Sequence, residues 1–260
     1  MSPLVMGVLN VTPDSFYDGG RYASSDAAVA HGHELIAAGA DVVDVGGEST
    51  RPGADPVEEA EELRRVVPVI GALAPHVRVS VDTSKASVAE AAVAAGATLI
   101  NDVSASLQCV AAAAGVGWVA MHRRGTPATM QIDPHYDDVV TEVRTFLVER
   151  AEAAVDAGVD EVWVDPGIGF GKLLRHNLAL LRHIAVLVET GYPVLVGTSR
   201  KAFLGTLTGG APVDDRLEGS LATAVHAMDA GAAMVRVHDV AATVQAARLV
   251  SGLSGTEVAA

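Results

Sequence analysis

The stretch 151–166, AEAAVDAGVDEVWVDP, shows the unit from which this chain is built: an alanine-rich helical segment, a glycine, a short apolar segment and a polar end. The same order recurs five more times, as VVDVGG, TLIND, WVAMH, PVLVGTSRK and MVRVHD after Gly39, Gly96, Gly115, Gly191 and Gly231. Two further apolar segments, VMGVLN at 5–10 and VRVSVDT at 77–83, complete a set of eight. Eight short strands that alternate with helices are typical of a closed parallel barrel. The sequence therefore predicts an α/β chain that folds as a single (β/α)8 TIM barrel.

The predicted strands are short and most of them are continuously apolar. They fall at residues 4–11, 42–46, 77–82, 98–101, 118–122, 162–165, 193–198 and 234–238. This composition suits strands that helices cover on one face and barrel packing fills on the other. Two intervening segments, 139–154 and 217–228, have apolar residues at helical spacing. The glycines before the strands suit the left-handed position that closes a helix, so we interpret them as structural.

Length and composition predict one folded domain. The 260 residues correspond to one barrel, which typically needs about 250. We assign residues 1–251 to the barrel and expect 252–260 to form a flexible C-terminal tail. Half of the residues are hydrophobic and 19% are charged, which supplies enough apolar material for a buried core.

Charge and cysteine content narrow the class of partner. The formal charge of −14 opposes binding to nucleic acid and to anionic membranes, so an anionic ligand needs a local basic site. The single cysteine, Cys109, excludes an intramolecular disulfide and a thiolate metal cluster. We see no signal-peptide pattern and no apolar run of about 20 residues. We therefore expect a cytoplasmic protein without a nucleic-acid or membrane partner.

Three predicted loops are longer than the usual connections of this architecture. They span 11–25, 46–58 and 199–216, and each follows a strand. Loops of this kind lie at the carboxyl ends of the strands, where TIM barrels hold their active sites. We therefore expect them to act as lids rather than as plain surface loops.

Polar residues stand at or just after the ends of most predicted strands: Asn10, Asp82, Asn101, His122, Asp165, Ser199, Lys201, Arg236 and His238. Each alone fits a capping role, but a closed barrel brings all of them to one mouth. Asp82, Asn101 and Asp165 come from strands 3, 4 and 6. Their carboxylates accept paired N–H donors, which suits a flat nitrogen heterocycle with an amino-pyrimidine edge. A divalent metal on the two aspartates is an alternative, although no histidine pair at ligand spacing stands at a strand end.

Basic residues point to an anion site beside this carboxylate side. Arg236 and His238 are two apart on an extended strand and therefore point the same way. Asn10 lies on the adjoining first strand, and Arg200 and Lys201 add positive charge. This set suits phosphate or pyrophosphate.

Longer motifs give the chain a resemblance to a known family. In order along the sequence they read VMGVLNVTPDSFYDGG, VDVGGESTRPGA, VSVDTSK, LINDVS, AMHRRGTPATMQ, VDPGIGFGK, PVLVGTSRKAFLG, DRLEGSLATA and VRVHDV. Through these motifs, which cover nearly the whole chain, it resembles the bacterial dihydropteroate synthases.

The resemblance implies an alkyl-group transferase of folate biosynthesis and a target of sulfonamides. Such an enzyme condenses 7,8-dihydropterin-6-ylmethyl pyrophosphate with p-aminobenzoate to give 7,8-dihydropteroate and pyrophosphate. The resemblance also implies Mg²⁺ as cofactor, bound through the anion and Asn10, and a homodimer. It implies dissociative substitution, in which the methylene carbon loses pyrophosphate before the arylamine attacks.

The family's motifs assign roles residue by residue. The resemblance implies catalytic roles for Asn10, Asp18, Lys201, Arg236 and His238. It implies pterin contacts for Asp82, Asn101, Met121, Asp165, Phe170 and Lys201. For p-aminobenzoate it points to Phe16, Thr50, Arg51, Pro52 and Ser199. For pyrophosphate it points to Asn10, Arg236 and His238, with Asn10 also as the metal ligand.

The chain departs from the family pattern in two places. The segment NDVSASLQCVAAAAG after strand 4 is shorter than usual, and Ala202 follows Lys201 where many members have serine. Three alternative functions remain open at this point. They are a pterin-dependent methyltransferase, which should lack the STRPG and SRK motifs, a Schiff-base aldolase built on Lys201, and a catalytically weak paralogue that acts as a binding or partner protein.

Overall fold

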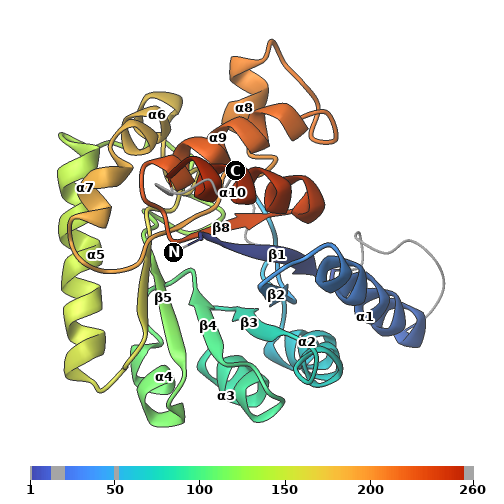
Figure 1. The fold of residues 1–260 in the computed structure, drawn as a ribbon. Coiled ribbons are helices and arrows are strands. Elements are labelled where there is room, and N and C mark those ends of the chain that lie inside the picture. The colour runs from blue at the N-terminus through green and yellow to red at the C-terminus, as the bar shows by residue number, and fades with distance from the viewer. Residues whose placement is uncertain (1, 13–20, 50–52, 255–260) are drawn as a thin grey trace.

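The structure, a computed structural model, describes residues 2–12, 21–49 and 53–254. Eight parallel strands form a barrel that helices surround (Figure 1). The strands are β1 Leu4–Asn10, β2 Val42–Gly46, β3 Arg78–Asp82, β4 Leu99–Asp102, β5 Gly117–Met121, β6 Val162–Asp165, β7 Leu195–Val196 and β8 Met234–Val237. Their order is β6-β5-β4-β3-β2-β1-β8-β7. The predicted TIM barrel is confirmed, and every predicted strand overlaps an observed one.

The barrel closes between β6 and β7 through a single bridge. Val164 pairs with Val194, and the Val164 amide donates to the Pro193 carbonyl at 3.0 Å. The pairing is short because Pro193 has no N–H to donate to a ladder. Pro193 thus limits pairing at the amino end of β7, which has two residues where the sequence predicted a strand at 193–198.

The helices lie outside the strands, and their bounds are α1 Arg21–Ala37, α2 Glu59–Leu73, α3 Ala86–Ala94, α4 Gln108–Ala114, α5 Val139–Asp156, α6 Leu174–Arg182, α7 Ile184–Val188, α8 Ala202–Leu207, α9 Leu217–Asp229 and α10 Val240–Ser254. Both helices expected from apolar spacing are present as α5 and α9. Helix α10 continues to Ser254, three residues past the expected barrel boundary. Within the described ranges, no helix is both long and apolar enough to cross a membrane.

The glycines that precede the strands have the conformation expected for helix ends. Gly39, Gly96, Gly115, Gly158, Gly191 and Gly231 all have positive φ, between 65° and 116°. A side chain at such a position is strained, so glycine ends each helix before the chain turns into the next strand. Their interpretation as structural residues is confirmed.

Side chains fill the barrel interior in two layers of different chemistry. Toward the amino ends of the strands lies an apolar layer: Met6, Val42, Leu99, Val119, Trp163, Leu195 and Met234. Side chains two positions apart on a strand point the same way. The next inward layer therefore contains Val8, Asp44, Asn101, Met121, Asp165, Gly197 and Arg236, four of which are polar or charged. The inward-facing side chains therefore change from apolar to mostly polar over two residues along the strands.

The shortened segment after β4 keeps a helix, α4, and is held by Asp102. This fully buried carboxylate accepts from the amides of Ser104, Ser106 and Leu107 at 2.6–2.8 Å, and from Trp118 Nε1 at 3.1 Å. One side chain thus satisfies the backbone donors of the turn that leads into α4.

Replacing Asp102 with alanine should lower the free energy of unfolding by about 3 kcal/mol, because several buried donors lose their acceptor together. Urea denaturation measures this change. Exposed Asp55 has no comparable role, and Asp55→Ala should stay within about 0.5 kcal/mol of the wild type. Equal effects of the two substitutions would contradict the structural role of Asp102.

Candidate active site

The polar layer forms a hydrogen-bonded network across the barrel interior. Arg236 of β8 donates from Nε to Asp44 Oδ2 at 2.6 Å and from Nη2 to Asp82 Oδ2 at 2.8 Å. Asn101 of β4 donates from Nδ2 to the same Asp44 oxygen at 2.9 Å. Strands β2, β3, β4 and β8 therefore contribute to one connected group.

Burial and charge shift the pKa values of this network. Burial raises the pKa of Asp82 to about 7, with Arg236 opposing the rise and Asp44 adding to it. For Arg236, burial acts to lower the pKa, but the Asp44 and Asp82 carboxylates outweigh it and raise the pKa further. The guanidinium is thus held charged between two buried carboxylates.

A second group lies at the ends of β6 and β7. Asp165 Oδ1 accepts from the Gly167 amide at 2.7 Å, and Lys201 Nζ donates to the Ile168 carbonyl. The Lys201 ammonium lies 4.6 Å from the centre of the Phe170 ring. Burial raises the pKa of Asp165 and lowers that of Lys201 to about 8, while their mutual attraction opposes both shifts. The structure therefore brings together three residues of the expected pterin set.

His238 and Ser199 lie together at the ends of β8 and β7. Ser199 Oγ is 3.0 Å from His238 Nδ1 and accepts from the His238 amide at 3.2 Å. Asn10 ends β1, and its Oδ1 lies 3.8 Å from the point where a Cβ on Gly46 would stand. Asp82 Oδ2 lies 3.7 Å from that same point. The Asn10 amide and the Asp82 carboxylate therefore both lie next to Gly46, where a Cβ would contact them.

Two basic residues lie differently from the arrangement that the sequence favoured. Arg236 contacts Asp44 and Asp82, so its side chain lies among the carboxylates rather than apart from them. Arg200 forms an ion pair with Asp239 at 2.6 Å, so its charge is already matched there. Lys201 is the residue of this loop that lies next to Asp165 and Phe170.

Several predicted site residues cannot be placed. Phe16, Asp18, Thr50, Arg51 and Pro52 lie outside the described residues. Of the predicted p-aminobenzoate set, Ser199 alone is described, and it is buried. Met121 is also buried, at the end of β5 and paired in register with Asp165.

Asp44 is a member of this network that the sequence analysis did not predict. It was passed over because it lies inside a predicted strand rather than at its end. A signal was present, since Asp44 follows the inward-facing Val42 by two positions, as Asn101 follows Leu99. A fully buried aspartate on an inward-facing position needs partners, and here they are Arg236 and Asn101.

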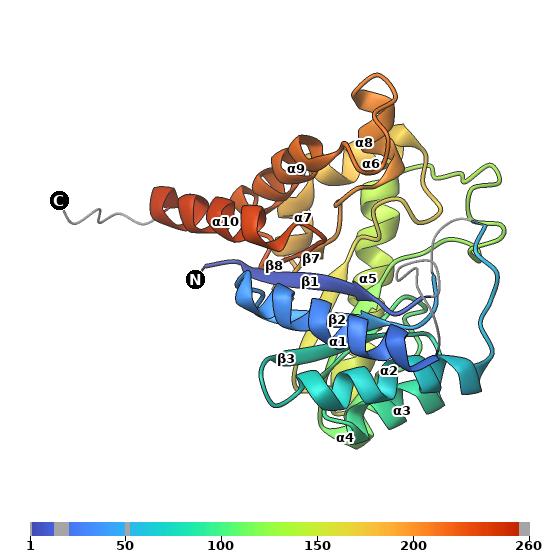
Figure 2. The ribbon, with the colours of Figure 1, turned by 90° about the vertical axis from the view of Figure 1, so that its right-hand side faces the viewer.

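The loop after β5, residues 122–138, is a further long connection that the sequence interpretation did not single out. The Gly53 amide donates to the Pro127 carbonyl at 3.0 Å, and Gln131 Nε2 donates to the Gly169 carbonyl at 2.8 Å. Figure 2 shows the loops after β2 and β5 side by side at the carboxyl end of the barrel. This loop therefore connects the loop after β2 with the loop after β6.

The metal alternative on Asp82 and Asp165 gains no support from these contacts. Asp82 is paired with Arg236, and Asp165 accepts from a backbone amide. Within residues 2–12, 21–49 and 53–254, no group of three or more His, Cys, Asp or Glu side chains is arranged to bind a metal.

Comparison with known proteins gives consistent matches. Residues 6–238 match the family described as pterin binding enzyme. The dihydropteroate synthase of Escherichia coli K12 is 47% identical over 256 residues, covering 95% of this chain and 90% of that protein. That of Mycobacterium leprae is 48% identical over 260 residues, covering 95% and 92%.

Solved structures agree with these relatives. Xanthomonas albilineans dihydropteroate synthase with 4-aminobenzoic acid superposes with a TM-score of 0.92 at 49% identity, covering 98% of this chain and 94% of that one. The Xanthomonas albilineans enzyme in complex with 7,8-dihydropteroate gives a TM-score of 0.88 at 47% identity, covering 98% and 95%.

The chain has three lysines, Lys85, Lys172 and Lys201, so lysine-selective ¹³C labelling should give three resolvable ε-carbon signals. One signal should titrate near pH 8 and disappear in Lys201→Arg, because burial lowers the pKa of Lys201 to about 8. Lys85 is the internal control: burial acts to lower its pKa, but Glu48 and Glu62 raise it above the ordinary range. A Lys201 signal that titrates at the ordinary value of 10.5 would contradict its buried environment.

Proposed function

The chain belongs to the pterin binding enzyme family, and on this premise we propose how its residues act as the site of a dihydropteroate synthase. The enzyme condenses 7,8-dihydropterin-6-ylmethyl pyrophosphate with p-aminobenzoate to give 7,8-dihydropteroate and pyrophosphate. The observation that carries the assignment of residues is the buried group of carboxylates and an amide beside Lys201 at the carboxyl end of the barrel.

The pterin ring is recognised by Asp82, Asn101 and Asp165, with Met121, Phe170 and Lys201 around it. Asp82 Oδ1 and Asn101 Oδ1 are buried and have no hydrogen-bond partner among the described residues. A buried acceptor without a donor is unfavourable, and the N–H groups of an amino-pyrimidine edge are suitable donors. Asp44 fixes Asn101 and Arg236 in place through its Oδ2 atom.

The reaction is a dissociative substitution. The bond from the methylene carbon to the pyrophosphate oxygen breaks, and both electrons leave with pyrophosphate. The electron-rich pterin and the nearby Asp165 carboxylate stabilise the cation, while Arg236 and His238 stabilise the departing anion. The neutral amine of p-aminobenzoate then attacks the carbon with its lone pair, and the arylammonium that forms gives its proton to the released pyrophosphate. A strong general base is not needed, because an arylammonium is a strong acid.

Mg²⁺ is the proposed cofactor, with Asn10 as its protein ligand. The Asn10 amide oxygen and the Asp82 carboxylate lie near each other beside Gly46, and such oxygen ligands suit an ion that takes few protein ligands and binds mainly substrate phosphates and water. When bound, the ion offsets negative charge on the pyrophosphate.

The remaining residues of the p-aminobenzoate pocket are proposed from the family motifs. Ser199 and Lys201 lie on one side, and Phe16, Thr50, Arg51 and Pro52 come from the two loops after β1 and β2, with Asp18 in the first of them. A relative solved with 4-aminobenzoic acid supports a pocket for this substrate. Closure of these loops would keep water away from the cation.

We also propose a homodimer and a cytoplasmic location. The homodimer is proposed from the resemblance to the family, and Leu207, Val213 and Leu217, on and between α8 and α9, are exposed apolar side chains that such an interface could cover. A chain with one cysteine suits a reducing compartment.

The alternative functions have less support. The relatives and solved structures named above are dihydropteroate synthases, which favours the synthase over a methyltransferase or a Schiff-base aldolase. The short segment after β4 was the reason to consider a catalytically weak paralogue. This segment still forms α4, and the turn before it is hydrogen-bonded to Asp102.

Purified chain incubated with the pterin pyrophosphate, p-aminobenzoate and Mg²⁺ should form dihydropteroate. Asp165→Asn keeps the shape and removes the charge, so kcat/KM should fall about 100-fold. Asp160→Asn changes an exposed aspartate just before the amino end of β6 and should have little effect. Absence of product from folded wild-type protein would exclude the synthase assignment.

Binding of 6-hydroxymethyl-7,8-dihydropterin, which lacks pyrophosphate, should strengthen as the pH rises to about 7 and then level off. Burial raises the pKa of Asp82 to about 7, so below that pH the carboxyl is protonated and accepts fewer hydrogen bonds. The gain approaches tenfold per pH unit on the acid side. Calorimetry between pH 5.5 and 8.5 measures it, and Asp82→Asn should abolish it. The same pH dependence in that variant would assign the titration to another group.

A further inference from the structure

Lys172 is a buried lysine that the proposed reaction does not use. Its side chain is 3% exposed, at the end of the loop after β6. The Nζ atom lies within 3.2 Å of three carbonyl oxygens, those of His122, Gly167 and Phe170. Each of these carbonyl oxygens is an acceptor for the N–H groups of Lys172.

Carbonyl oxygens take the place of a counter-ion around Lys172. Among the described ion pairs, none includes Lys172. Burial lowers its pKa well below the ordinary range, with the charge of Asp165 opposing the shift. His122 Nδ1 is 2.9 Å from Nζ, and burial lowers the pKa of His122 to about 3, so its ring is neutral at pH 7. The side chain is therefore placed by polar contacts to the backbone rather than by an ion pair.

The loop that Lys172 binds, residues 166–172, carries part of the proposed pterin site. Lys172 contacts the Gly167 and Phe170 carbonyls, and between them the Ile168 carbonyl accepts from Lys201 Nζ. Gly167 also donates its amide to Asp165. The geometry of Asp165, Phe170 and Lys201 is thus linked to the shape of this loop.

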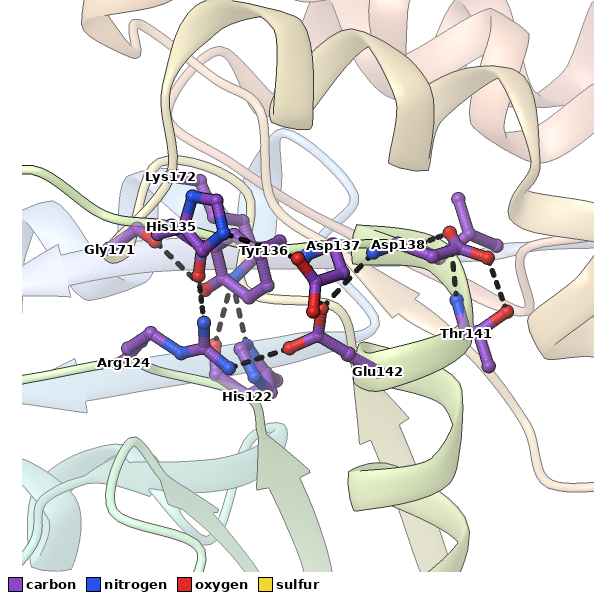
Figure 3. Close-up of polar contacts among 11 residues, drawn as sticks. His122, Arg124, His135, Tyr136, Asp137, Asp138, Thr141, Glu142, Gly171 and Lys172 are labelled. Carbon is purple, nitrogen blue, oxygen red and sulfur yellow. Dashed lines mark hydrogen bonds and ion pairs between the residues drawn. The ribbon is translucent and has the colours of Figure 1, made fainter.

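The same loop is pressed against the end of β5 at two glycines. A Cβ on Gly167 would lie 1.9 Å from the His122 carbonyl oxygen, and one on Gly171 would lie 2.3 Å from that of Arg124. Tyr136 donates its hydroxyl to the Gly171 carbonyl at 2.8 Å, with the Arg124 guanidinium 4.0 Å above its ring. Figure 3 shows His122, Arg124, Tyr136, Gly171 and Lys172 gathered where the two loops meet.

We propose that Lys172 is a positioning residue for the pterin side of the site: by joining the end of β5 to the loop after β6, it fixes where Asp165, Phe170 and Lys201 stand. This inference rests on the proposed function. Methionine has a similar length but no donor, so Lys172→Met leaves three buried carbonyls without their partner while filling most of the space.

The test uses wild-type protein, Lys172→Met and, as a matched control, Arg78→Met. Arg78 loses an ion pair with Glu161 at the amino end of the barrel, away from the substrates. Affinity for 6-hydroxymethyl-7,8-dihydropterin should fall roughly tenfold or more in Lys172→Met. The KM for p-aminobenzoate should change by a clearly smaller factor, because its proposed pocket shares only Lys201 with the pterin side. The Lys201 ε-carbon signal should shift in this variant, and Arg78→Met should change neither affinity nor signal.

A second variant keeps the test decisive if Lys172→Met does not fold. Tyr136→Phe removes the hydroxyl that donates to Gly171, and pterin affinity should fall about threefold. Unchanged pterin affinity in folded Lys172→Met overturns the inference, as does an equal loss for both substrates. If Lys172→Met is unfolded, unchanged affinity in Tyr136→Phe overturns it. Failure of the wild-type protein to form dihydropteroate concerns the proposed function instead.

Discussion

Arg236 places a positive charge inside the barrel, where Asp44 and Asp82 would otherwise be buried without a counter-ion. Removing water from a carboxylate is costly unless a charge and hydrogen bonds replace it. The guanidinium supplies both, because its planar array of donors reaches two carboxylates at once. Strands β2, β3 and β8 thereby meet in a polar layer directly above the apolar layer that fills the amino half of the barrel. A site rich in buried carboxylates is compatible with a stable barrel for this reason.

Lysines perform three different tasks at the same end of the barrel. Lys85 bridges Glu48 and Glu62 and so ties the β2 loop to β3 and α2. Lys201 lies beside Asp165 and Phe170, in the proposed pterin site. Lys172 is surrounded by carbonyls of two loops. The pKa shifts follow these surroundings: carboxylate partners raise the pKa of Lys85, whereas burial lowers those of Lys172 and Lys201. The role of each lysine therefore depends on the groups that surround it and not on its position at the carboxyl end of the barrel.

Much of the fold was predictable because its signals are local. Six glycines with positive φ, the ones named above, each end a helix within a few residues of the strand that follows. The apolar runs set the strands to within a few residues. Asn101, Asp165 and Lys201 were found because they stand at or just after strand ends. Asp44 was missed because it lies in the middle of a strand and not at the strand's end. Its side chain nevertheless faces the barrel interior and is fully buried. Pro193 is a local signal that limits the pairing of β7, but the pairing of Val194 with Val164 depends on the closure of the barrel.

The sequence by itself determined the eight-strand alternation, the helix ends and the set of polar residues that meet at one mouth, since each depends on spacing along a few residues. The tertiary structure alone decided which of those residues pair. Arg236 lies 192 positions from Asp44 and 154 from Asp82, and Lys172 lies 50 from His122. Arg200 is next to Lys201 in sequence, but its side chain forms an ion pair with Asp239. Such pairings depend on how the closed barrel sets one strand beside another and on which way each loop turns, and no local spacing encodes either.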